Sequence, residues 1–301
     1  MQRFEDGDRV CGRMESVAEP RTRRLANGMI AEIRADRWVR GAYELIVDGT
    51  PQSHVDISDP THLAYEYVRR MGNLIDEVAA PDQPITAVHF GAGALTLPRY
   101  IEATRRGSLQ QVIELERDLV DFVRDEIPWD HAASIRVRYG DAREVLGRLP
   151  AGLDGTADVV VVDVFTGAQT PPHVTSVEFY REVARLLAPD GIMLVNVADG
   201  PPQRYARSQA ATLTEAVGPV VVLAESSVFK GRRFGNFVIA AARAGIPDSW
   251  LPRLFAAGPH PATVATGDEL AGFMSGALVA TDATATGSPA PNRGVFRFGV
   301  D

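Results

Sequence analysis

The stretch DVVVVDVFTGAQTPPH, residues 158–173, decides the fold. Its four consecutive valines, 159–162, form a short apolar run that ends on Asp163, and the chain then passes through turn-forming Thr, Gly and Pro residues. A short β-branched run bounded by turn residues predicts a central strand that is buried on both faces. We therefore expect Asp163 to lie at the carboxyl end of a strand in a parallel sheet.

Strands and helices alternate on both sides of this run from residue 85 onward. We predict strands at 85–90, 110–115, 135–139, 158–163 and 192–197, and helices at 95–106, 117–126, 142–149, 175–188 and 203–217. Thr175 and Glu178 have the spacing of a capping box for the fourth of these helices. Only a short turn separates two further strands, 219–226 and 233–242, so these should pair antiparallel. The pattern predicts an α/β fold with a mostly parallel sheet that ends in an antiparallel hairpin.

The remaining segments divide the chain into four predicted parts. Residues 1–28 show no period and are expected to form a disordered arm. Residues 29–80 hold three short alternating segments, 29–35, 42–49 and 52–58, which predict a small antiparallel sheet, and then a linking helix with Asp59 as N-cap and Pro60 at its first position. Residues 81–244 form the main α/β domain. Residues 245–301, rich in Pro, Gly, Ala and Thr, predict an irregular tail with at most a short helix near 267–277.

Composition excludes several classes of protein. The 301 residues carry 31 basic and 39 acidic side chains, a net charge of −8, which argues against a nucleic-acid partner. The six histidines are scattered without metal-site spacing, so no metal is expected. No apolar stretch reaches the roughly 18 residues of a membrane span. The single cysteine, Cys11, cannot form an internal disulfide. We expect a cytoplasmic protein with no membrane partner.

Polar or glycine residues end four successive predicted strands, at the sheet edge where ligands bind in such folds. Gly91 and Gly93 follow the first strand and allow close backbone approach to a ligand. Glu114 ends the second strand at a spacing suited to ribose hydroxyls. Asp141 follows the third strand, where its carboxylate and the backbone N–H of Ala142 could meet an adenine ring. Asp163 ends the fourth.

The glycine loop also indicates which nucleotide is bound. Ala94 and Leu95 follow Gly93, so the third glycine of the dinucleotide pattern is absent, and no second nucleotide-binding half is evident. We therefore favour S-adenosylmethionine, or a relative of it, over NAD.

Residues 40–242 resemble the spermidine synthase (polyamine aminopropyltransferase) family, and are most similar to its actinobacterial spermidine synthase-like branch. The resemblance is carried by VDGTPQSHVDISDPTHLAYEY, FGAGAL, IELE, GDAREVL, VVDVFTGAQTPPHVTSVEFY and VFKGRRFGN. It implies a class I methyltransferase-like Rossmann fold behind a small N-terminal sheet, a homodimer, a small amine as acceptor, and S-adenosylmethionine or its decarboxylated form as co-substrate. It also implies that Gln52 contacts the co-substrate and that Asp163 is catalytic.

Three departures from the family pattern concern the amine rather than the nucleoside. Ala94 stands where the family has an Asp that contacts the amino group of the co-substrate, and Thr166 stands where the catalytic loop has its second Asp. A pocket Tyr of the family falls on Ala64, with Tyr65 adjacent, and Glu66 could supply a missing charge. We assign Tyr65, Glu66 and Thr166 to the substrate pocket.

Three functions remain open from the sequence. Amine attack on the sulfonium-bound carbon requires positioning and a proton acceptor, and Asp163 can hold an ammonium and take up its proton. Methyl transfer to an unidentified acceptor is the first alternative, because the absence of an acid at Ala94 would favour a co-substrate that keeps its carboxylate. A nucleoside-binding protein without catalysis is the second. The basic run KGRR, 230–233, is either a solvated turn or a cationic lid.

Overall fold

The computed structural model describes residues 20–291, which form two sheets. The predicted arm at 1–28 is wrong for its last part, because Arg21–Arg24 form strand β1. Residues 1–19, with Cys11, lie outside the described residues. Arg21 and Arg23 pair with Glu126 and Asp125 at 2.7 and 2.9 Å, so this basic run docks on helix α3 (Arg117–Glu126) of its own chain.

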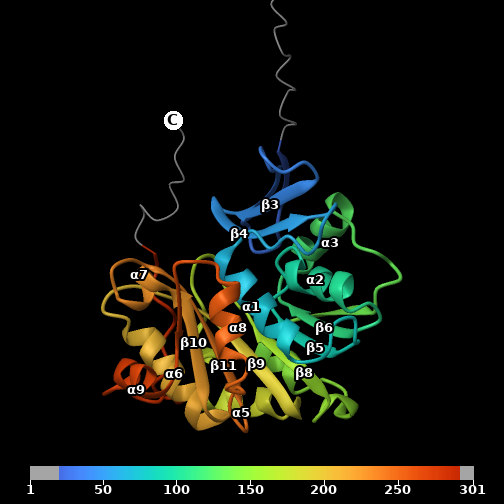
Figure 1. Cartoon of the computed structure of the whole chain (residues 1–301). Helices are drawn as coiled ribbons and strands as arrows, with labels where there is room; N and C mark the ends of the chain where they lie inside the picture. Colours follow the sequence, from blue (N-terminus) through green and yellow to red (C-terminus); the bar gives the residue numbers. More distant parts are fainter. Residues whose placement is uncertain (1–19, 292–301) are drawn as a thin grey trace, which may run out of the picture.

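The N-terminal sheet is antiparallel throughout, in the order β1-β2-β3-β4. Its strands are β1 (Arg21–Arg24), β2 (Ile30–Ala35), β3 (Ala42–Val47) and β4 (Thr50–Asp56). The last three confirm the predicted strands. This sheet lies above the main domain in Figure 1.

The main sheet has the order β12-β10-β11-β9-β8-β5-β6-β7. Its strands are β5 (Thr86–Phe90), β6 (Leu109–Glu114), β7 (Ile135–Tyr139), β8 (Ala157–Val162), β9 (Leu187–Asp199), β10 (Val220–Glu225), β11 (Gly235–Ala242) and β12 (Ala262–Ala265). Strands β5 to β9 pair in parallel, whereas β11 is antiparallel to both β9 and β10. The predicted parallel sheet with a terminal hairpin is confirmed.

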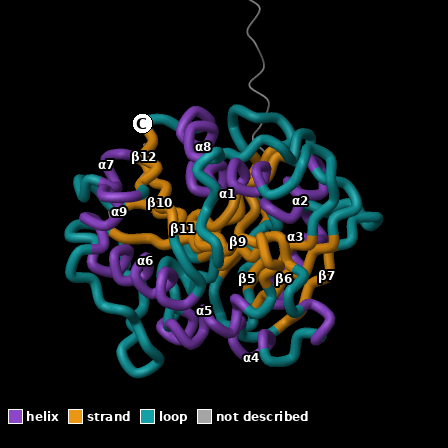
Figure 2. The backbone as a smooth tube through the Cα atoms, turned by 60° about the horizontal axis from the view of Figure 1, so that its bottom comes forward, coloured by secondary structure: helices purple, strands orange, loops and turns teal. Residues whose placement is uncertain are grey.

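Helices cover both faces of the main sheet (Figure 2). They are α1 (Glu66–Glu77), α2 (Thr96–Thr104), α3 (Arg117–Glu126), α4 (Ala142–Leu146), α5 (Val177–Ala184), α6 (Arg204–Ala216), α7 (Ser226–Phe229), α8 (Leu251–Ala257) and α9 (Gly267–Met274). The four valines of β8 show how the layers form: Val159 and Val161 pack in the cluster with α1, α2 and α8, and Val160 and Val162 pack with α5 and α6. Alternate side chains of a strand face opposite sides, so this run buries both faces.

Three predicted boundaries are corrected. Helix α1 begins at Glu66 rather than near Pro60, because the Asp59 carboxylate accepts hydrogen bonds from the backbone and hydroxyl of Thr61 and so holds a turn. Helix α5 is capped by Ser176, not by Thr175, and ends at Ala184. The tail predicted as irregular contains α8 and β12, and β12 pairs antiparallel with β10.

Candidate active site

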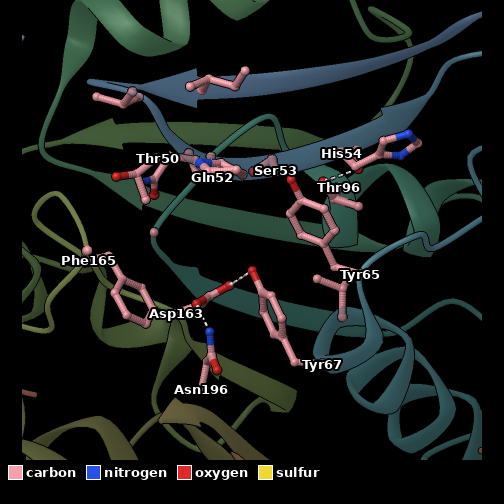
Figure 3. Close-up of a pocket in the computed structure, with 18 of the residues that line it drawn as sticks. Thr50, Gln52, Ser53, His54, Tyr65, Tyr67, Thr96, Asp163, Phe165 and Asn196 are labelled. Atoms are coloured by element: carbon pink, nitrogen blue, oxygen red, sulfur yellow. Dashed lines mark hydrogen bonds between the residues drawn. The ribbon is translucent and has the colours of Figure 1, made fainter. Parts of the chain in front are cut away.

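A cavity of about 1240 Å³ lies between the N-terminal sheet and the carboxyl ends of the central strands. The chain order reverses between β5 and β8, since β6 lies on one side of β5 and β8 on the other. Open α/β sheets bind ligands at this switch point. Figure 3 shows the arrangement, with Gln52, Ser53 and His54 on strand β4 facing Asp163, Phe165 and Asn196.

All the predicted site residues lie in the lining of this one cavity. They are Gln52, Tyr65, Glu66, Gly91, Gly93, Glu114, Asp141, Ala142, Asp163 and Thr166. Their common location is a finding about geometry, and the role of each stays a prediction.

The glycine loop after β5 requires glycine at two positions. Gly91 has φ +95°, and a Cβ there would lie 2.1 Å from the carbonyl oxygen of Asp163. Gly93 has φ +49°, and its Cβ would lie 2.3 Å from the hydroxyl of Ser53. Larger residues are excluded by both backbone strain and contact, so the loop brings β5 and β8 close together under the N-terminal sheet.

Glu114 is held at the end of β6 by backbone donors. One carboxylate oxygen accepts a hydrogen bond from the amide of Ala92 at 2.8 Å, and the other accepts one from the amide of Glu116 at 2.9 Å. Burial raises the pKa of this carboxyl, and the backbone hydrogen bonds oppose the change. Each carboxylate oxygen can accept a further hydrogen bond, so the group is positioned for two hydroxyl donors in the cavity.

Asp141 has two separate tasks. Its Oδ1 caps α4 by accepting hydrogen bonds from the amides of Arg143 and Glu144, at 2.9 and 3.2 Å. Its Oδ2 lies 2.7 Å from Nε2 of His173, which also lines the cavity. The helix cap and the cavity position are therefore compatible, because they use different oxygens.

Asp163 carries an uncompensated charge at the end of β8. Its Oδ1 accepts a hydrogen bond from the amide of Asn196 at 2.8 Å, and its Oδ2 accepts one from the hydroxyl of Tyr67 at 3.3 Å (Figure 3). Among residues 20–291 it forms no ion pair. Burial raises the pKa of this carboxyl, and its two neutral partners lower it only in part. Since the donors come from side chains, Asp163 does not serve as a cap for a backbone segment.

A second tyrosine–carboxylate pair faces the first. The hydroxyl of Tyr65 donates to Oε1 of Glu44 on strand β3 at 2.9 Å, and both residues line the cavity. The rings of Tyr65 and Tyr67 lie side by side, with centroids 6.3 Å apart. Glu44 likewise forms no ion pair within the described part of the chain.

Three other acids in the lining form ion pairs with arginine. The pairs are Glu32–Arg34, Glu66–Arg70 and Glu225–Arg233. The predicted contribution of Glu66 to a cationic substrate is thus reduced by Arg70, at 3.3 Å. Arg233 of the KGRR run lines the cavity with its charge balanced by Glu225 at 2.9 Å, which weakens the prediction of a cationic lid.

The position of Ala94 corrects one sequence argument. Ala94 is fully buried, packs in the cluster beneath the N-terminal sheet, and donates its amide hydrogen to the Ser53 hydroxyl at 3.1 Å. Its side chain is not part of the cavity lining. The absence of an acid there therefore opens no space for a co-substrate carboxylate, and the argument for methyl transfer loses its basis.

Three residues of the site were missed from the sequence. Tyr67 follows Tyr65 by two positions, and its hydroxyl rather than that of Tyr65 reaches Asp163. Asn196 interrupts the apolar run of β9, and a buried polar residue inside such a run was a usable signal. Glu44 gave no signal, because alternating polar residues are ordinary on a sheet strand.

The sheet order and the position of the cavity define a class I methyltransferase-like Rossmann protein. No protein-family model matches the chain. The polyamine aminopropyltransferase of Neisseria meningitidis serogroup A is 27% identical over 180 residues, 59% of this chain and 65% of that relative. A solved probable spermidine synthase from Corynebacterium glutamicum is 28% identical, with a TM-score of 0.79, over 88% of this chain and 97% of that chain. Human methyltransferase-like protein 13 shares the fold, at 16% identity and a TM-score of 0.50, over 64% of this chain and 87% of that chain.

The chain is therefore similar in sequence and in structure to the spermidine synthase, or polyamine aminopropyltransferase, family. It spans about 65% of the length of the Neisseria relative it matches. Two further findings concern residues 20–291 alone: no helix there is long and apolar enough to cross a membrane, and no group of three or more His, Cys, Asp or Glu side chains could hold a metal ion.

Proposed function

We propose that this protein transfers an aminopropyl group from decarboxylated S-adenosylmethionine to a small amine. The observation that carries the proposal is the carboxylate of Asp163, which lies at the switch point with neutral donors on both oxygens and no cation beside it among residues 20–291. A carboxylate that is largely withdrawn from water without a counter-ion is costly. A cationic amine substrate would supply the missing charge.

The nucleoside part of the co-substrate fits the other end of the cavity. Gly91 and Gly93 form the tight turn that borders this end, Glu114 presents two oriented oxygens to a ribose diol, and Asp141 with Ala142 borders the adenine position. When bound, the co-substrate supplies a propyl carbon activated by its sulfonium. Attack by the amine forms the new C–N bond and breaks the C–S bond, and methylthioadenosine leaves.

The chain's own residues prepare the amine. An ammonium must lose one proton before its nitrogen can attack. Asp163 lines the cavity at the carboxyl ends of the strands and can accept this proton. Burial raises the pKa of Asp163 and so makes it a better base, while Tyr67 and Asn196 fix the direction of its oxygens. Asp163 later releases this proton to solvent. The product is a secondary amine, which is protonated in solution.

Glu44 supports a diamine as the acceptor. The second acid of the family's catalytic loop is replaced by Thr166, but Glu44 offers a second carboxylate from the N-terminal sheet, and no counter-ion pairs with it in the described part of the chain. The adjacent rings of Tyr65 and Tyr67 connect the two carboxylates and would line the methylene chain between them. We infer that Asp163 holds the reacting nitrogen and Glu44 holds the distal ammonium.

One experiment tests the proposed reaction. Purified protein is incubated with decarboxylated S-adenosylmethionine and a panel of monoamines and diamines, and methylthioadenosine is measured. We expect turnover with a diamine and tighter calorimetric binding of the decarboxylated form than of S-adenosylmethionine. Release of S-adenosylhomocysteine from S-adenosylmethionine, with no methylthioadenosine from any amine, would reject it in favour of methyl transfer. The family resemblance further supports a cytoplasmic location and a homodimer, and light scattering on the purified protein tests the dimer.

A further inference from the structure

The loop between β8 and α5, residues 163–176, carries part of the acceptor site, and its first half, residues 163–169, is only partly buried. It contains small residues between Asp163 and the Pro-Pro pair, and its internal anchor is a tight turn in which the amide of Thr166 donates to the carbonyl of Gln169 at 2.8 Å. On the cavity side Gln52 donates to the carbonyl of Gly167 at 3.1 Å. Such a loop needs support from outside to keep one conformation.

That support comes from a segment more than a hundred residues later, which we call the C-terminal strap (residues 280–288). Ser288 is 1% exposed. Its hydroxyl accepts a hydrogen bond from the amide of Thr170 at 2.8 Å, its amide donates to the Thr170 carbonyl at 3.2 Å, and its carbonyl accepts from the side chain of Gln169 at 2.6 Å. One serine therefore satisfies three polar groups of the loop.

The other end of the strap is fixed by charge. Asp282 receives both terminal nitrogens of Arg143, at 2.7 and 2.8 Å, and the hydroxyl of Ser176 donates to the same carboxylate. Arg143 also donates to the carbonyl of His173 in the loop at 3.3 Å. These hydrogen bonds, first that from Arg143, lower the pKa of Asp282 to about 2. A two-pronged arginine–carboxylate contact is among the stronger surface interactions because its geometry is fixed.

The strap also reaches the acceptor site and the helix beyond it. The carbonyl of Ala280 accepts a hydrogen bond from the amide of Val177 at 2.8 Å, at the start of α5. Pro291, three residues after Ser288, lines the cavity. The strap thus follows the second half of the loop, from Gln169 to the start of α5.

We propose that the C-terminal strap is a permanent part of the acceptor site and that Ser288 is a positioning residue, which holds the β8–α5 loop in place before any ligand binds. The loop therefore has the same conformation in the free protein as in the ligand-bound protein. The part of the inference that concerns amine binding rests on the proposed function, whereas the part that concerns the loop does not.

Hydrogen exchange on the free protein tests the loop. In Ser288→Ala we expect the amide of Thr170 and the other amides at 166–170 to exchange on the order of fivefold faster. This is the effect expected from the loss of about one buried hydrogen bond. Ser275→Ala makes the same change at an exposed position of the C-terminal part without a side-chain contact, and should leave exchange unaltered. Equal exchange in Ser288→Ala and wild type would overturn the proposal.

A second variant tests the proposal if Ser288→Ala does not fold. If Ser288→Ala does not fold, Asp282→Asn, at an exposed site, weakens the contact with Arg143 and should raise exchange at residues 173–177. No change there would overturn the proposal.

Binding measurements then separate the two inferences. With loop exchange raised, the dissociation constant of a diamine should rise several-fold in Ser288→Ala while that of the co-substrate stays within twofold. An unchanged diamine constant would overturn the positioning role. Faster loop exchange in Ser288→Ala, combined with no aminopropyl transfer by wild type, would support the strap and reject the proposed function.

Discussion

The hydroxyl of Tyr67 lies 3.3 Å from one oxygen of Asp163, while the other oxygen is bound by Asn196. Both donors are neutral, so they orient the carboxylate and leave its charge available. Tyr67 comes from the first turn of α1 and Asp163 from the end of β8. The linking helix therefore takes part in the site and does not only join the two sheets.

Replacement of Asp163 by Asn should abolish most of the activity without loss of stability. We expect kcat to fall by about 10² to 10⁴, the usual contribution of a positioned proton acceptor. The pKa of Asp163 is raised in the fold by burial, so its ionised form opposes folding at neutral pH, and Tm should stay equal or rise. Asp190→Asn, at an exposed position near the start of β9, is the matched control. Activity within twofold of wild type in Asp163→Asn would exclude this residue as the base.

The pH profile of the reaction should follow the ionisation of Asp163. Its carboxyl has a pKa raised above 3.8, so activity is present above that pKa and is lost as the pH falls through it. In Tyr67→Phe the carboxylate loses a donor that lowers its pKa, and the acidic limb of kcat/KM should move upward by about one pH unit. Tyr43→Phe, whose ring packs outside the cavity lining, should leave the profile unchanged. A shift toward lower pH in Tyr67→Phe would contradict this assignment.

Glu44→Gln should distinguish diamines from monoamines. Removal of the distal charge is expected to raise KM for a diamine by about tenfold, because a charge-assisted hydrogen bond is lost, and to change KM for a monoamine by less than twofold. Glu269→Gln, an exposed site on α9, controls for net charge. Equal effects on both kinds of amine would show that Glu44 does not contact the distal end.

Gly91→Ala should destabilise the protein more than any of these changes. The added Cβ would meet the carbonyl of Asp163 at 2.1 Å in a backbone conformation with φ +95°, and we expect a loss of at least about 2 kcal/mol in the free energy of unfolding. Gly152→Ala, where a Cβ would meet nothing within 4 Å, is the control. Thermal or denaturant unfolding measures both, and similar stabilities would mean that the loop can relax around a side chain.

Local signals predicted most of the fold. The alternating strands and helices of the main domain follow from apolar runs of a few residues, and so does the antiparallel hairpin of β10 and β11. Errors occurred where distant contacts outweigh local preference. Strand β12 has a weak pattern of its own and becomes a strand because β10 offers it an unpaired edge. Helix α1 begins late because the Asp59 turn competes with the first helical turn.

The sequence by itself determined the central sheet, the position of Asp163 at a strand end and the presence of a glycine turn after the first strand, because each depends on neighbours within a few residues. Tertiary structure alone decided which groups meet there. Tyr67, Asn196 and Glu44 reach one cavity from an early helix, a central strand and the N-terminal sheet. The strap that holds the catalytic loop is more distant still. No periodicity spans such separations, since these contacts form only when the sheets pack and bury their apolar faces.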